Sequence, residues 1–408
     1  MKRGRRAAEG QVSSAMAGTT PSNGSPGVPG TPRVLRAMND RAALDLLAAH
    51  GPLTRTRIGE LTGLSKPTTS QLLSRLESAG LVRTTGRQSG RPGPNAVLYE
   101  IDPAVGHVAA LSADPTGITA LVSDITGREV GRRRIEADSV SEDVRHRTAQ
   151  LVVEAVDGAL AKAGLGHHDL RATVIGTPGA IDPHSGQLRY APHLPGWHSR
   201  TLRAELAEVL GTPVTIENDV NLAAIAEQYE GAAQDNDNFV LVWLDEGVGA
   251  AIVLGGVLLR GATGGAGEIG YMPVPGAPLL RGGPDSTPEA YRGGFESLVS
   301  GAVVRERAGG RTLTEALADP AARDELAGHI ATGLAAVVAV VDPELVVLSG
   351  QVAQAGGEEL RLRVKEEMTG LALPRPHLRI SELDGDPILT GALRTALTQA
   401  RDTVFDTA

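Results

Sequence analysis

The 408-residue sequence predicts an α/β protein with a small winged helix-turn-helix head and a larger two-lobed body. Residues 33–101 carry apolar side chains at helical spacing and end in two short strand-like runs. Residues 105–408 alternate apolar strand runs with helical runs, which is typical of α/β folds. Charge separates the same parts: the first 100 residues hold 14 Lys/Arg and 6 Asp/Glu, and the rest hold 25 and 42.

This charge division favours a head that meets a polyanion, although chance clustering of arginines is the alternative. The absence of cysteine excludes disulfides, thiolate catalysis, iron–sulfur clusters and cysteine-ligated zinc. The sequence shows no uninterrupted apolar run of the roughly 20 residues that a bilayer-spanning helix needs. No apolar stretch follows Arg5-Arg6, so we expect no export signal. We therefore expect a cytoplasmic, nucleoid-associated protein without a membrane partner.

Residues 1–32 are rich in Pro, Gly and Ser and are predicted to form a disordered tail. A first amphipathic helix, ending near His50, is predicted from four apolar residues at helical spacing: Leu35, Met38, Ala42 and Leu46. Thr54 is the expected cap of a short second helix, and a tight turn follows at Gly63. Ser65 is then the expected cap of a third helix, which buries Leu72, Leu76 and Ala79.

Short polar side chains at the front of such a helix suit contacts with base edges, and basic ones reach phosphates. The residues expected to bind DNA on this helix are Ser65, Lys66, Pro67, Thr68, Thr69, Gln71 and Arg75. The strand-like runs at 81–85 and 96–99 predict a wing that adds Arg87 and Arg91. The alternative is a winged helix used for protein contacts.

In the body, runs at 108–112 and 119–123 predict a hairpin around Thr116-Gly117, followed by a helix at 148–163 and a strand at 172–176. Runs at 239–244 and 250–254 open a second, similar unit. The predicted lobes are about 105–235 plus the C-terminal helix, and about 236–390. A cleft is expected between them.

Several motifs resemble the ROK family of sugar kinases and transcriptional repressors. In the head, the runs 63–70, 76–82 and 90–92 resemble the MarR-like winged helix of ROK repressors. In the body, the resemblance lies in the runs 176–182, 191–197, 217–224, 261–270, 343–350 and 391–392. It implies a sugar-kinase/actin-like (ribonuclease-H-like) body with a sugar site in the cleft.

The phosphate loops that the resemblance implies are altered. The family's Asp-x-Gly-Gly-Thr is Asp114-Pro115-Thr116-Gly117 here, and proline removes an amide donor. The family's Gly-Thr-Gly-x-Gly is Asp245-Glu246-Gly247-Val248-Gly249, whose carboxylates repel a triphosphate. The family's Gly-Gly pair on the adenosine side of the ATP site is Ser349-Gly350 here. We therefore expect no ATP cofactor, no catalytic residue and no enzymatic activity.

The family's zinc site is also altered, because Tyr271 replaces its histidine and Thr287, Glu289 and Gly294 replace its cysteines. We expect no metal, although a cluster of His184, His193 and His198 is an alternative. The resemblance implies that five residues bind ligand: His193, Asn218, Asp219, Glu268 and Glu296. The alternative is that Asn218 and Asp219 now only cap a helix.

Together these observations predict a DNA-binding transcriptional regulator, a repressor of carbohydrate-related genes. The expected partners are a palindromic double-stranded operator and a sugar or sugar-phosphate effector, bound by a homodimer or dimer of dimers. Two alternatives stay open: a regulator with a vestigial pocket controlled by a protein partner, and an active sugar kinase with a DNA-binding head.

Overall fold

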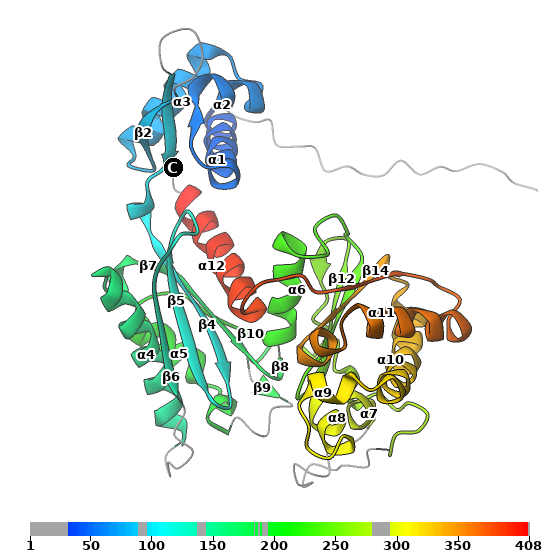
Figure 1. Cartoon of the computed structure of the whole chain (residues 1–408). Helices are drawn as coiled ribbons and strands as arrows, with labels where there is room; N and C mark the ends of the chain where they lie inside the picture. Colours follow the sequence, from blue (N-terminus) through cyan, green and yellow to red (C-terminus); the bar gives the residue numbers. More distant parts are fainter. Residues whose placement is uncertain are drawn as a thin grey trace, which may run out of the picture.

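The computed structural model describes residues 32–88, 96–136, 144–182, 184–186, 188–189, 195–279 and 294–406 (Figure 1). Residues 1–31 of the predicted tail, the wing residue Arg91 and the pocket residue His193 lie outside this part of the chain. The described residues form a winged-helix head, residues 32–101, and a body of two lobes, each built on a five-stranded sheet.

The head is built from α1 (Pro32–His50), β1 (Leu53–Thr54), α2 (Arg55–Thr62), α3 (Lys66–Ser78), β2 (Val82–Gln88) and β3 (Ala96–Ile101). The Thr54 hydroxyl accepts from the amide of Arg57 and caps α2, and Ser65 caps α3. Gly63 ends α2 at a φ of 70°, a conformation that costs glycine little. The predicted caps and turn are confirmed. The strand β1, which pairs with β3, was not predicted.

The buried face of α1 differs from the predicted one. Its core residues are Ala43, Leu44 and Leu47, whereas Leu35 is 53% exposed and Met38 is 62% exposed. The helix begins about two turns before its first buried residue, Asp40, so its first apolar residues stay largely exposed. The expected burial of Ala79 is also wrong, because this residue is the exposed C-cap of α3.

Lobe one orders its strands β10-β7-β4-β5-β6, with β4, β5 and β6 antiparallel and β7 and β10 parallel to β4. The strands are β4 (His107–Asp114), β5 (Gly117–Asp124), β6 (Glu129–Glu136), β7 (Leu170–Thr177) and β10 (Val214–Asn218). A short ribbon pairs β8 (Ala180–Ile181) with β9 (Leu188–Arg189). The flanking helices are α4 (Val144–Ala163), α5 (Leu202–Leu210), α6 (Asp219–Glu230) and α12 (Pro387–Phe405).

Lobe two repeats this topology in the order β13-β12-β11-β14-β15, which confirms the predicted second unit. Its strands are β11 (Phe239–Leu244), β12 (Val248–Leu254), β13 (Val257–Leu258), β14 (Leu345–Ser349) and β15 (His377–Ile380). Its helices are α7 (Glu296–Val299), α8 (Gly301–Arg307), α9 (Leu313–Leu317), α10 (Pro320–Val341) and α11 (Gln351–Leu371). Figure 1 shows the lobes side by side, with the head at the far end of lobe one.

Helix α10 is long and apolar enough to cross a membrane by length and composition alone. Its side chains Leu326, Ile330 and Leu334 are buried in the core that α10 shares with α11 and the lobe-two sheet. This burial accounts for its apolar composition, since a core helix and a membrane helix draw on the same residues.

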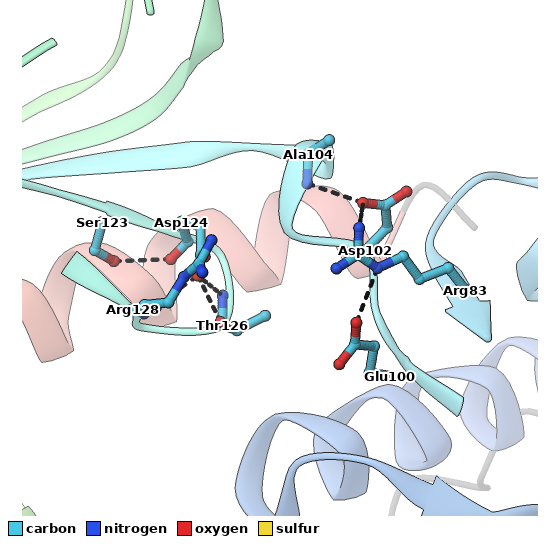
Figure 2. A network of polar contacts seen from close by, with 8 residues as sticks. All are labelled: Arg83, Glu100, Asp102, Ala104, Ser123, Asp124, Thr126 and Arg128. Carbon is cyan, nitrogen blue, oxygen red and sulfur yellow. Dashed lines mark hydrogen bonds and ion pairs between the residues drawn. The ribbon is translucent and has the colours of Figure 1, made fainter. Parts of the chain in front are cut away.

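Polar contacts lie on both sides of the junction between head and body, and Figure 2 shows them beside the ribbon of α12. Arg83 on β2 donates to Glu100 at 2.9 Å and pairs with Asp102 at 3.7 Å. Asp102 also accepts from the amide of Ala104, where the chain enters the body. Asp124 closes the neighbouring β5–β6 turn by accepting from Thr126 and Arg128.

Candidate functional sites

The first candidate site is the exposed N-terminal half of α3. Four side chains at its start, those of Ser65, Lys66, Pro67 and Thr68, are exposed, and Gln71 follows one turn later. The Ser65 hydroxyl lies 2.8 Å from that of Thr68 and caps the helix, so it serves the local structure first. Lys66, Thr68 and Gln71 form the polar surface that a groove of DNA would meet.

Thr69 does not belong to this surface. It is 1% exposed, and its hydroxyl donates to the carbonyl of Ser65 at 3.0 Å. A Cβ at Gly59 on α2 would lie only 3.1 Å from that hydroxyl, so Thr69 packs in the contact between α2 and α3. The predicted DNA contact is wrong, because Thr69 is buried: two residues along a helix correspond to about 200°, so Thr69 faces the core when Gln71 faces solvent.

Arg75 lies at the end of α3 and is engaged within the head. Its guanidinium donates to Asp40 on α1 at 2.6 and 3.3 Å. The Asp40 side chain is 9% exposed and that of Arg75 is 41% exposed. This ion pair ties α3 to α1, so Arg75 already has a structural partner in the absence of DNA.

Exposed basic residues also lie on the wing strand β2 and at the start of α2. Arg87, for which a DNA contact is predicted, is exposed on β2. Arg55, at the start of α2, is exposed and donates to Ser70 on α3 at 3.0 Å. Sequence reasoning missed Arg55, although a basic first-turn residue in the helix before α3 was the available signal.

The second candidate site is the cleft between the lobes, of about 2010 Å³. Lobe one contributes the β4–β5 turn and the start of α6, and lobe two contributes the β11–β12 turn, Glu268 and the start of α7. The segment 384–388, which leads into α12, also lines it. The cleft therefore brings together Asn218, Asp219, Glu268 and Glu296, four of the five predicted ligand-binding residues.

The side chain of Asn218 makes two local hydrogen bonds. Its carbonyl oxygen accepts from the amide of Asn221 at 3.0 Å and caps α6. Its amide nitrogen donates to the carbonyl of Gly179 at 3.1 Å. This side chain therefore caps α6 and links it to the segment after β7, and it lines the cleft as well.

Asp219 and Glu268 have carboxyl groups that resist ionisation. Burial, and then the nearby charge of Asp245, raise the pKa of Asp219 to about 6, although its Oδ1 accepts from the amide of Val220. Burial, followed by the charges of Asp219 and Glu296, raises the pKa of Glu268 to about 7. Near neutral pH these carboxyls can either donate or accept hydrogen bonds, which suits the hydroxyls of a sugar.

A positive-φ glycine helps to position Glu268. Gly267 has a φ of 96°, and a Cβ there would lie 1.9 Å from the carbonyl of Ala250. Only glycine permits this close approach to β12, which directs the next residue toward the cleft.

In the first altered phosphate loop, residues 114–117, the backbone amides bond to a carboxylate of the same loop. The carboxylate of Asp114 accepts from the amides of Thr116 and Gly117, at 2.6 and 3.1 Å, and from the Thr116 hydroxyl. Pro115 has no amide hydrogen to offer. The backbone donors of this turn therefore point at the protein's own carboxylate.

The second altered loop has the same property. The carboxylate of Asp245 accepts from the amide of Glu246 at 2.8 Å and from that of Gln351 at 3.1 Å. Gln351 is the first residue of α11, whose positive end attracts anions. Asp245 thus occupies this anion position, and Glu246 is ion-paired with Arg305.

Among the described residues, no group of three or more His, Asp or Glu side chains is placed to hold a metal ion. His184 is exposed, and His198 lies 3.2 Å from the carbonyl of Leu188. His193, Thr287 and Glu289 fall outside the described residues.

A sequence model of the ROK family matches residues 110–377. This range includes the four predicted ligand-binding residues that line the cleft, Asn218, Asp219, Glu268 and Glu296. The chain belongs to the ROK family. A model of the MarR family matches residues 38–91 of the head.

Known relatives of this ROK protein include both kinases and repressors. It is 30% identical over 254 residues to a glucokinase of Thermotoga maritima, a match covering 57% of this chain and 77% of that protein. It is 24% identical over 240 residues to the xylose repressor of Bacillus subtilis, covering 59% of this chain and 61% of the repressor. The match thus spans less than two thirds of the repressor's length.

Among solved structures, a ROK family transcriptional regulator described as a homologue of the E. coli MLC protein superposes with a TM-score of 0.68. The superposition covers 92% of this chain and 100% of that structure, at 20% identity. The two chains therefore share a fold that includes both head and body.

Proposed function

We propose that this ROK protein is a DNA-binding transcriptional repressor that responds to a sugar in its cleft. The observation that carries the proposal is the exposed polar start of α3, presented by a winged head on a ROK body. In helix-turn-helix proteins, this part of the second helix of the motif lies in the major groove and contacts base edges. We assign this contact to Lys66, Thr68 and Gln71. We assign a supporting contact with the phosphate backbone of the DNA to Arg87. The repressor relatives support the same function.

The head, residues 33–101, binds one half-site, and the body, residues 105–408, dimerises and holds the ligand. A two-fold protein binds two half-sites of a palindromic operator, so a homodimer or a dimer of dimers is the expected assembly. Ligand binding changes the closure of the lobes. That change alters the relative placement of the two heads and weakens operator affinity.

The charge of the cleft favours an unphosphorylated sugar over a sugar phosphate. Ten acidic residues and one basic residue, Arg305, line it among the residues that the structure describes. Arg305 is already paired with Glu246. Asp114 accepts from two amides of the first loop, and Asp245 accepts from one amide of the second. A phosphate group would therefore meet negative charge at both loops, where these amides already bond to the protein's own carboxylates.

The same occupied amides argue against phosphoryl transfer, which depends on positioning and neutralising the phosphates. A sugar kinase remains the second candidate function, because the resemblance to the ROK family implies that Asp219 matches the catalytic base of its kinases, and a glucokinase is among the relatives. ATP turnover on a panel of hexoses tests it directly. We expect none above the rate of an Asp219→Asn variant.

The proposed function is tested by fluorescence anisotropy on the DNA upstream of the protein's own gene. The titration is repeated over a salt series, with and without sugars and their phosphate esters. We expect tight, salt-dependent binding that one free sugar weakens. Lys66→Ala and Gln71→Ala should weaken binding, whereas Lys365→Ala, an exposed lysine on α11, should not.

Three other outcomes have distinct meanings. Binding that a sugar phosphate releases would retain the repressor and overturn the choice of a neutral ligand. Binding that no sugar changes would indicate a vestigial pocket and a protein effector. Equal effects of the Lys66 and Lys365 substitutions would remove α3 as the DNA-contacting helix.

A further inference from the structure

We propose that Arg41 is a positioning residue that fixes the winged-helix head to α12, the helix whose other end lines the cleft. The proposal rests on the proposed function and adds the route by which ligand in the cleft reaches the DNA-binding surface. Its parts are an ion-pair cluster at the head, a shared apolar core, and a close contact between α12 and α6.

Arg41 on α1 reaches across to the last turn of α12. Its guanidinium donates to Asp402 at 2.6 Å and to Asp406 at 3.2 Å, and lies 5.6 Å from the centre of the Phe405 ring. A third bond, to Asp45 at 2.9 Å, stays within α1. A planar guanidinium that donates to several acceptors and stacks on an aromatic ring is held in one orientation more firmly than a cation in a single ion pair.

The ion pairs lie on a continuous apolar contact. One core cluster contains Leu44 and Leu47 of α1, Ile101 at the end of β3, and Val404 and Phe405 of α12. The same cluster continues into lobe one through α12 and the strands beneath it. The head is therefore packed against the body, and a movement of α12 moves the surface on which α1 rests.

The opposite end of α12 lies at the cleft. Asp386 caps this helix by accepting from the amides of Ile388 and Leu389, both at 3.0 Å, and Asp386 and Ile388 line the cleft. With 19 residues, α12 spans about 28 Å. One rigid element thus extends from the ligand site to the head, as its course in Figure 1 shows.

Helix α6 connects the ligand-binding carboxyl to α12. It begins at Asp219, and α12 crosses it so closely that a Cβ at Gly391 would lie 1.9 Å from the carbonyl of Leu222. Further along, Arg394 on α12 pairs with Glu230 at the end of α6 at 2.5 Å. Because the two helices are packed without space between them, a shift of α6 on ligand binding displaces α12 as well.

The fixed placement of the head is measured without DNA or ligand. The chain has no cysteine, so Glu77→Cys on α3 and Glu205→Cys on α5 give two unique spin-label sites. Pulsed electron paramagnetic resonance, with labelled chains diluted in unlabelled protein, then reports the distance within one chain. We expect a narrow distribution that Arg41→Ala broadens and Asp45→Ala leaves unchanged, since Asp45 pairs with Arg41 only inside α1.

A charge swap, Arg41→Asp with Asp402→Arg, should restore the narrow distribution, which separates the ion pair from general damage to the fold. On operator DNA, Arg41→Ala should weaken binding about tenfold because the heads are no longer pre-placed. The slope of affinity against salt should not change, because the Arg41 guanidinium faces α12. The ratio of affinities without and with the releasing sugar should fall toward one.

An Arg41→Ala distribution as narrow as that of the unsubstituted chain would overturn the inference, whatever the DNA results. A fall in the salt slope would also overturn it, because Arg41 would then be a phosphate contact. If the unsubstituted protein does not bind DNA, the proposed function fails on its own, while the distance measurement still decides whether Arg41 positions the head.

Discussion

Replacing Arg75 distinguishes a residue that holds the head together from one that contacts DNA. Arg75→Ala leaves the Asp40 carboxylate, 9% exposed, without its guanidinium. Breaking a buried pair costs about 3–5 kcal/mol, and an exposed pair contributes about 0–1 kcal/mol. Since the Arg75 side chain is 41% exposed, we expect an intermediate loss of about 2 kcal/mol.

Hydrogen exchange detected by mass spectrometry measures this loss in the head of the full chain. A loss of about 2 kcal/mol corresponds to exchange about 30-fold faster in peptides from α1 and α3. Asp40→Asn should have a smaller effect, because the amide oxygen still accepts one hydrogen bond. Arg57→Ala, which removes an exposed pair with Glu60, is the matched control and should change exchange little.

Operator binding over a salt series tests the alternative that Arg75 contacts a DNA phosphate. A phosphate contact by Arg75 would lower the salt slope by about 0.9 on substitution. Unchanged exchange together with that lower slope would refute the structural role and restore the expectation from the sequence. Faster exchange with an unchanged slope would support the ion pair.

Three further predictions concern the packing and the cleft, and each of the two on packing has a control substitution. Gly391→Ala should lower the unfolding free energy by about 3 kcal/mol in thermal or urea unfolding, because its methyl group meets backbone of α6, whereas Gly370→Ala has open space and should not destabilise. Leu44→Ala should cost about 2–5 kcal/mol in urea unfolding and Leu35→Ala less than about 0.5 kcal/mol, and equal losses would contradict the buried face of α1. The pKa of Asp219 is higher in the folded chain, about 6, than in the unfolded chain, so its contribution to stability is complete below about pH 4 and is lost as pH rises through about 6. Asp219→Asn should flatten that part of the pH profile of the unfolding free energy, and an identical profile would show that this carboxyl ionises normally.

Local signals in the sequence were sufficient for the element boundaries that depend on neighbouring residues. Thr54 and Ser65 cap the helices that they precede, and Gly63 adopts the positive φ of a helix end. The hairpin around Thr116 and the second strand–turn–strand unit at 239–254 follow from alternating and continuous apolar runs. Each of these features is decided within a few residues, so the chain encodes it locally.

Burial on a helix face was less predictable, because it depends on what packs there. The spacing of Leu35 and Met38 is helical, yet the head ends before it reaches them. Thr69 has the composition of a DNA-contacting residue, but the crossing of α2 buries it against Gly59. The short strand β1 has two residues and exists only through its pairing with β3, so no local pattern predicts it.

For the cleft, the sequence by itself determined the residue types: the family's motifs, the retained Asp219 and Glu268, and carboxylates in both phosphate loops. Tertiary structure decided what those groups do. It placed the Asp245 carboxylate on the first amide of α11, 106 residues away, and Arg41 on Asp402, 361 residues away. The physical reason is that side-chain chemistry belongs to one residue, whereas hydrogen bonds, desolvation and ion pairs belong to two partners that only the folded chain brings together.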